Sequence, residues 1–235
     1  MTRLVGHLVS AWRYPVSCAG GERLLALEAG RDGLAGDRQF AVIDAATRQP
    51  ASPERERRWH PATWLHARLD AAGSAEVKLP DGGWCLAAAA AGPLSKHFGF
   101  PVEVQSYASG IRHRYRPGHA HLLTTASMAA LQAAVPGSSL DPARFRPNLL
   151  VETLPGLEGT VEQDWIGHEL QVGGARLAVN KPCGRCSFTS LPQHGLPLDR
   201  EILRALIRRH ERNFGVICHI VGPGRMMEGD MVTVL

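Results

Sequence analysis

The sequence predicts a mainly β protein with a few short helices. Its apolar stretches are short, and glycine- and proline-containing turns separate them: the 235 residues include 25 glycines and 16 prolines. Helical spacing of apolar side chains extends over ten residues or more only near residues 125–135 and 198–209. Short strands with frequent glycine punctuation are typical of antiparallel β units.

In the first half of the chain, each expected element lies between such turns. Strands are expected at residues 7–12, 23–28 and 39–44, with a turn-rich loop at 30–36. Residues 53–64 are irregular and charged, and residues 70–86 are expected to form a hairpin with its turn at 80–83. The pattern changes near Gly92, after which we expect a short helix at 93–98 and a strand at 102–107.

The second half begins with a basic loop at residues 112–121 and a helix at 125–135, which Thr124 or Thr125 can cap. A strand at 146–152 follows a proline-bounded turn, and residues 165–170 and 176–180 are expected to pair about Gly173 and Gly174. An amphipathic helix at 198–209 precedes the closing strands at 215–221 and 231–235.

Composition excludes several classes of protein. Hydrophobic residues make up 44% and charged residues 20%, which is ordinary for a soluble globular chain and excludes disordered, collagen-like and coiled-coil proteins. No apolar run approaches the roughly 18 residues that a membrane span needs. The first residues lack a signal-peptide pattern, so we expect a cytoplasmic protein without a membrane span.

The positive charge is modest and comes almost entirely from arginine. Lysine plus arginine exceeds aspartate plus glutamate by 26 − 22 = 4, and three of the 26 basic residues are lysines. No basic stripe with interleaved aromatic residues appears, which argues against a nucleic-acid partner. Arginine is the better side chain for bidentate binding of phosphate or carboxylate groups.

Five cysteines are present, and an odd number without a signal sequence argues against a disulfide framework. The strongest local motif, at residues 181–186, reads KPCGRC and holds Cys183 and Cys186. Such a pair can be half of a zinc site, a redox dithiol, a metal–thiolate ligand or two buried thiols in a turn. No second pair supplies the remaining ligands of a zinc site, so these alternatives stay open at this point.

Three arginines stand in contexts that suit anion binding. Arg185 lies inside the cysteine motif, where its guanidinium can lower the pKa of a thiol and donate two parallel hydrogen bonds to an anion. Arg146 and Asn148 are two residues apart on a segment expected to be extended, so they should point to the same side. Arg38 lies where a loop enters a strand.

Together these residues resemble the MOSC proteins. The pieces that carry the resemblance occur in the order of that family: YPV at 14–16, GDR at 36–38, FRPN at 145–148, WIG at 165–167, KPCGRCSFT at 181–189, FG at 214–215 and GD at 229–230. More closely, the chain resembles YcbX and the mitochondrial amidoxime-reducing component. That resemblance implies a small N-terminal β-barrel domain at residues 1–82 and a MOSC β-barrel domain at 83–235.

The resemblance also implies a cofactor and an activity. It implies a molybdenum cofactor of the molybdopterin type, with Cys186 as the metal ligand and catalytic residue; a soft thiolate suits such a metal. Gly184, Arg185, Arg146, Asn148 and Arg38 are expected to hold the pterin and its phosphate. The implied activity is a molybdenum-dependent oxidoreductase that reduces small N-hydroxylated compounds. A separate flavin reductase, haem or iron–sulfur protein would deliver its electrons.

The chain departs from the family pattern in three places. Ser17 is expected to line the cofactor site, at the position where relatives carry a lysine that contacts the cofactor. Cys18 follows it, so one cation is missing from the expected phosphate site. Residues 190–193 read SLPQ where relatives carry Val-Asp-Pro, and the middle loop at 116–119 reads RPGH. These changes bear on the substrate and on cofactor occupancy more than on the fold.

Two other hypotheses remain. The chain could be a non-catalytic carrier that binds the cofactor or holds a persulfide on Cys186, and metal content distinguishes this from the enzyme. It could also be a β-barrel interaction domain with buried thiols, in which Cys186 would not react with alkylating agents.

Overall fold

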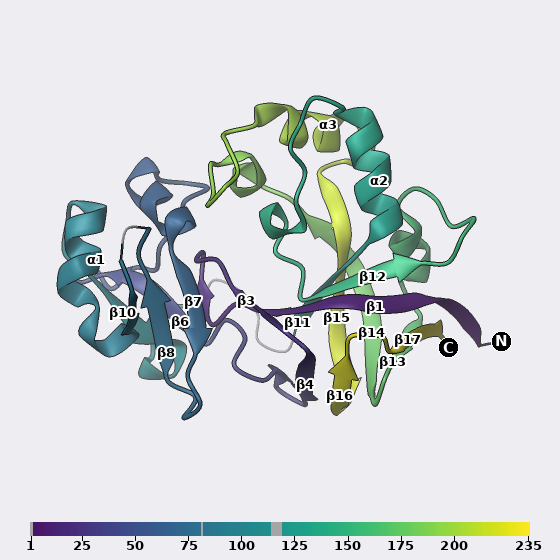
Figure 1. Ribbon diagram of the computed structural model, residues 1–235, viewed down its shortest axis with the longest axis horizontal. Coiled ribbons are helices and arrows are strands. Elements are labelled where there is room, and N and C mark those ends of the chain that lie inside the picture. The colour runs from purple at the N-terminus through teal and green to yellow at the C-terminus, as the bar shows by residue number, and fades with distance from the viewer. Residues whose placement is uncertain (1, 81, 114–118) are drawn as a thin grey trace.

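A closed seven-stranded barrel forms the larger part of the molecule (Figure 1). The structure is a computed structural model that describes residues 2–80, 82–113 and 119–235. The barrel strands are β1 (Arg3–Arg13), β11 (His119–Thr124), β12 (Leu149–Thr153), β13 (Glu169–Val172), β14 (Ala175–Gly184), β15 (Asn213–Gly222) and β17 (Met231–Val234). Their order is β12-β11-β15-β14-β13-β17-β1, and pairing of β1 with β12 closes the ring. Only the β11–β12 pair is parallel.

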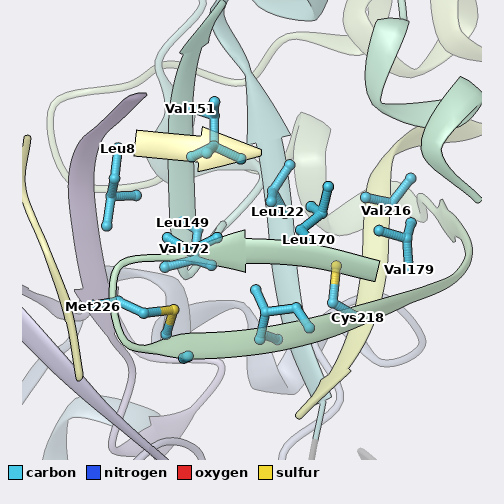
Figure 2. Packing of buried hydrophobic residues seen from close by; sticks show 14 of the residues in the cluster. Leu8, Leu122, Leu149, Val151, Leu170, Val172, Val179, Val216, Cys218 and Met226 are labelled. Atoms are coloured by element: carbon cyan, nitrogen blue, oxygen red, sulfur yellow. The ribbon is translucent and has the colours of Figure 1, made fainter. Parts of the chain in front are cut away.

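The interior of this barrel is a packed apolar core. Alternating side chains along each strand point inward, as expected for a sheet with one buried face. Leu8, Leu122, Val172 and Val216 are fully buried there, and Figure 2 shows them among side chains from the surrounding strands. Cys218 belongs to the same cluster, and burial raises the pKa of its thiol to about 12. Cys218 is therefore a small hydrophobic residue of the core.

A smaller β unit lies beside the barrel, to the left in Figure 1. One three-stranded sheet contains β2 (Val16–Ser17), β6 (Phe40–Asp44) and β10 (Val102–Ser106), and another contains β7 (His66–Leu69), β8 (Ala75–Lys78) and β9 (Trp84–Leu86). A parallel bridge between Gly20 and His66 connects the two sheets. Trp59 and helix α1 (Ala91–Phe98) complete their shared apolar core. The arrangement agrees with the small β-barrel that was expected.

The remaining strands and helices cover the barrel. Strand β3 (Glu22–Leu24) pairs with β1, while β4 (Ala26–Gly30) joins β5 (Gly33–Leu34) and β16 (Gly224–Met227). Helices α2 (Thr125–Ala134) and α3 (Arg200–His210) lie together at one end of the barrel (Figure 1). Short 3-10 helices are found at Arg57–Trp64, Ala87–Ala89, Tyr107–Ser109, Pro142–Arg144, Val161–Trp165 and Ser187–Ser190.

The strand pairings cross the expected boundary between residues 82 and 83 in two places. Strand β1 belongs to the barrel, because it lies between β12 and β17. Strand β10 pairs with β6, and α1 packs into the core of the small unit. The division into domains 1–82 and 83–235 stays a prediction. In the structure, β1 belongs to the barrel and precedes every strand of the small unit.

Most expected elements are present, with two instructive differences. The hairpin about Gly173 and Gly174 is confirmed, but its first strand begins at Glu169 because Trp165 ends a 3-10 helix. Strand β11 begins at His119, inside the expected basic loop, whose residues 114–118 lie outside the described part. Residue 81 of the expected 80–83 turn also lies outside it. Of the helices described, none has the length and apolar character needed to span a bilayer.

Candidate functional site

Asn148 connects the barrel with the segments that lead into the small unit. Its side chain is fully buried; Oδ1 accepts hydrogen bonds from Arg38 Nη1 (3.0 Å) and the backbone N of His121 (3.1 Å), and Nδ2 donates to the carbonyl oxygen of Trp12 (3.1 Å). The amide thus joins β1, β11 and the loop before β6. It holds these segments, and with them Arg38, in place.

Arg38 crosses from the small unit to the barrel. Besides Asn148, its guanidinium donates to the carbonyl oxygen of Arg146 (3.3 Å) and forms an ion pair with Asp37. Asp37 also accepts a hydrogen bond from the backbone N of Tyr14 (2.8 Å). The sequence places Arg38 and Arg146 more than 100 residues apart, and the fold brings them into direct contact.

Arg146 lies between two aromatic rings. Its Cζ is 4.3 Å from the ring centroid of Tyr14 and 5.6 Å from that of Phe188, within the range of cation–π contact. The expectation of an extended segment here is wrong: Arg146 has a φ of 54°, and β12 starts only at Leu149. The guanidinium also donates to the carbonyl oxygen of Ala19. Arg146 therefore has a left-handed backbone conformation, and it shares with Asn148 the contact to Arg38.

Cys183 lies in a polar environment at the end of β14. Nη1 of Arg185 donates to its Sγ at 3.0 Å, and Nη2 of Arg185 donates to the carbonyl oxygen of Phe145 at 2.7 Å. His121 lies on β11, which is separated from β14 by β15. The ring of His121 packs against Gly215. Gly215 has a φ of 76°, and a Cβ atom added there would lie 2.4 Å from His121 Nε2. A glycine is required at this crossing.

The surroundings of Cys183 favour a thiolate. Burial alone would raise the pKa of this thiol, but the nearby His121 ring and Arg185 guanidinium outweigh it and lower the pKa to about 6. Assignment of the metal to Cys186 predicts that Cys183 is a small, buried hydrophobic residue, and this prediction is wrong. The side chain of Cys183 is partly exposed and accepts a hydrogen bond from a cation, so it is one of the polar groups of the site.

Cys186 is the exposed cysteine of the motif. Its carbonyl oxygen accepts hydrogen bonds from the backbone N (3.2 Å) and Oγ1 (3.0 Å) of Thr189, which fix the start of the 3-10 helix Ser187–Ser190. The loop also contacts the small unit, because Ser187 Oγ donates to the carbonyl oxygen of Glu54 (3.1 Å). Gly184 is exposed next to it and pairs with Asn213 of β15. The thiol of Cys186 is thus presented to solvent from a fixed backbone.

Ser17 lies away from these contacts. It is buried and accepts a hydrogen bond from the hydroxyl of Tyr107 at 3.1 Å. Hydrogen bonds and ring contacts among the described residues bring together Arg38, Arg146, Asn148 and the loop with Arg185, and they do not include Ser17. Residues 116–118 of the divergent middle loop lie outside the described part.

A protein-family comparison matches the MOSC domain to residues 112–233, just over half of the chain. The chain belongs to the MOSC family. Its domain spans six of the seven barrel strands, together with Arg146, Asn148, Arg185 and both cysteines of the motif. MOSC domains are associated, as a family, with binding of molybdenum cofactor.

One solved structure agrees with the fold. YuaD from Bacillus subtilis aligns over all of this MOSC protein and 96% of its own chain, with a TM-score of 0.51 and 14% identity, so the likeness concerns the fold alone. YiiM from Escherichia coli aligns over the whole of this chain and 70% of its own, with a TM-score of 0.44 and 12% identity. Sequence comparison with curated proteins finds no match.

Sequence reasoning missed two groups of this site. His121 falls in the segment expected to be a basic loop, but it lies between Ala120 and Leu122 on the buried strand β11. Tyr14 was noted only as part of a motif; its hydroxyl donates to the carbonyl oxygen of Pro147 (3.1 Å), and burial raises its pKa, so the phenol stays neutral. The signal for His121 was the apolar pair Leu122 and Leu123 that follows it, whereas no comparable local signal marks Tyr14.

The donor groups present fit a pterin-based molybdenum cofactor. Nε of Arg185 is buried and, among the described residues, has no hydrogen-bond partner. No set of three or more metal-binding side chains gathers in the described part. A single exposed thiolate suits a metal that its own cofactor already ligates, and the nearby arginines suit an anionic group.

Proposed function

We propose that this MOSC protein binds a molybdenum cofactor through Cys186 and reduces N-hydroxylated small molecules with electrons from a separate redox protein. The observation that carries the proposal is the exposed thiol of Cys186, presented on a fixed loop next to Arg185 and close to the Arg38–Arg146 contact. The implied cofactor supplies two-electron redox chemistry at an N–O bond.

Different residues would hold different parts of the cofactor. Cys186 would provide the soft ligand. Arg185 would bind an anionic group through its unused Nε, because its other two nitrogens already hold Cys183 and Phe145. Asn148 and Asp37 would act as positioning residues that orient Arg38. The rings of Tyr14 and Phe188 would keep Arg146 in place.

The experiment is metal and pterin analysis after expression in a host that makes the cofactor. We expect about one molybdenum per chain in the wild-type protein. Cys186→Ser should lose the metal and the reduction of an N-hydroxylated test compound while the fold is retained. Cys183→Ser should keep the metal and serves as the matched control. Loss of metal from Cys183→Ser, with full activity in Cys186→Ser, would reverse the assignment.

The carrier hypothesis makes a different prediction for the same sample. A protein without molybdenum that carries a labile persulfide on Cys186 would favour sulfur transfer over reduction. Mass spectrometry of the intact protein before and after mild reduction detects this, because a persulfide adds one sulfur atom that reduction removes.

A further inference from the structure

A groove of about 650 Å³ opens directly beside the loop that carries Cys186. One wall comes from the small unit, over residues 53–60, and the other comes from α3 and the segment after the cysteine motif. Ser187, the residue after Cys186, lines the groove. A volume of this size accommodates an organic ligand of ordinary dimensions. None of Arg38, Arg146 or Arg185 belongs to its lining, so the groove is distinct from the cluster described above. The loop after Cys186 contacts both, because Ser187 lines the groove and Phe188 packs against Arg146.

The groove combines an apolar surface with an excess of positive charge. Leu198 and Ile207 both line it while 53% and 50% exposed, respectively, so the groove presents apolar surface to a ligand. Its charged lining residues are four arginines and one glutamate: Arg55, Arg57, Arg200, Arg204 and Glu54. Arg57 and Arg200, on opposite walls, form no ion pair within the described part of the chain.

A buried hydroxyl in the groove is also unused. Ser190 is 5% exposed and lines the groove, and its Oγ has no hydrogen-bond partner among the described residues. A buried polar group without a partner is destabilising. A ligand with a polar atom at this point would satisfy it, so the hydroxyl is an independent indication of a ligand.

We propose that this groove binds the substrate, and that the substrate is an organic anion with an extended apolar body. The apolar surface near Leu198 and Ile207 would cover the body, and Arg57 and Arg200 would bind the anionic group from both walls. The assignment as substrate rests on the function proposed above, whereas the chemical class of the ligand rests on the groove alone.

The test compares two amidoximes that differ in one group. The probes are biphenyl-4-carboxamidoxime and the same compound with a carboxylate on the far ring, each titrated calorimetrically into the full-length protein. We expect the carboxylated compound to bind at least ten times more tightly. The double variant Arg57→Gln/Arg200→Gln should reduce that preference to less than threefold. Ser190→Ala should weaken binding of the carboxylated compound.

The matched control is Arg31→Gln/Arg209→Gln, which removes the same charge at two exposed positions outside the groove and should keep the preference. Equal affinity of the wild-type protein for the two compounds, or an unchanged preference in the Arg57/Arg200 variant, would overturn the proposal. Molybdenum is measured in each preparation. If protein from a host that makes the cofactor contains no metal but shows the preference, the groove proposal is supported and the reductase proposal fails. If the protein contains the metal but shows no preference, the groove proposal alone is overturned.

Discussion

Cys183 and Cys186 are separated by two residues, but the fold gives their side chains different surroundings. Cys186 is exposed, whereas Cys183 lies between His121 and Arg185 with a pKa of about 6, well below its ordinary value of 9.0. Because the native state lowers this pKa, the native state binds the proton less tightly than the unfolded chain. The thiolate therefore adds stability that is complete above about pH 9 and disappears as the pH falls through 6.

We predict that the difference in free energy of unfolding between the wild-type protein and Cys183→Ser increases from pH 6 to pH 9. Urea denaturation of cofactor-free protein at several pH values measures it. Cys85→Ser is the control, since Cys85 donates a hydrogen bond to a carbonyl oxygen in the small unit, away from this site. A difference that stays flat or decreases over this range would contradict the charged state of Cys183.

Gly215 is the residue on which the contact between His121 and Cys183 depends. We predict that Gly215→Ala destabilises the protein by at least about 1–3 kcal/mol, the cost of a strained positive φ, with a further cost from the clash with His121. Thermal unfolding measures this. Gly137→Ala is the control: no atom lies within 4 Å of the added Cβ, and we expect a change within about 0.5 kcal/mol.

At the scale of elements, the segment after Cys186 is held by one buried arginine. Arg144 is fully buried and donates to the carbonyl oxygens of Ser139 (3.0 Å), Pro197 (2.8 Å), Thr189 and Leu191 (both 3.4 Å). Burial lowers its pKa, and these carbonyl groups take the place of a carboxylate partner. One side chain therefore fixes both ends of the segment from 189 to 197.

We predict that Arg144→Met, which roughly conserves volume, lowers the free energy of unfolding by more than about 3 kcal/mol, because several buried carbonyl groups lose their donor. Proteolysis within residues 189–197 should become faster under native conditions. Arg209→Met on the exposed face of α3 is the control and should change stability by less than about 0.5 kcal/mol. Unchanged proteolysis in Arg144→Met would show that other contacts hold the segment.

Local pattern was sufficient to predict many strands and helices but insufficient for the site. The hairpin about Gly173 and the amphipathic helix near 198–209 follow from glycine placement and apolar spacing, both of which are local. The left-handed turn at Arg146 is different, because two rings and a carbonyl group from distant segments surround its side chain. Likewise, the polar neighbours of Cys183 are Arg185 of its own motif and His121 of β11, and β11 comes near β14 only because both pair with β15.

At the scale of the whole molecule, β1 connects the first described residues to the MOSC barrel. We predict that a fragment of residues 83–235 does not fold into a cooperative barrel, because β12 and β17 lose the strand that joins them. Circular dichroism and thermal unfolding measure this. Adding residues 1–13 as a separate peptide is the control and should restore part of the structure. A fragment that unfolds cooperatively by itself would support a domain boundary at residue 82.

The same closing strand has a consequence for synthesis on the ribosome. Strand β1 is made before the other described strands and pairs with β17, the last of them, so the ring can be completed only after β17 has emerged. Until then β1 has an unpaired edge, which is a risk for aggregation. All strands of the small unit's two sheets are available much earlier, so this unit can form while the barrel is incomplete. Contacts between such distant segments slow folding. Closure of the barrel during synthesis should therefore wait for β17 to emerge.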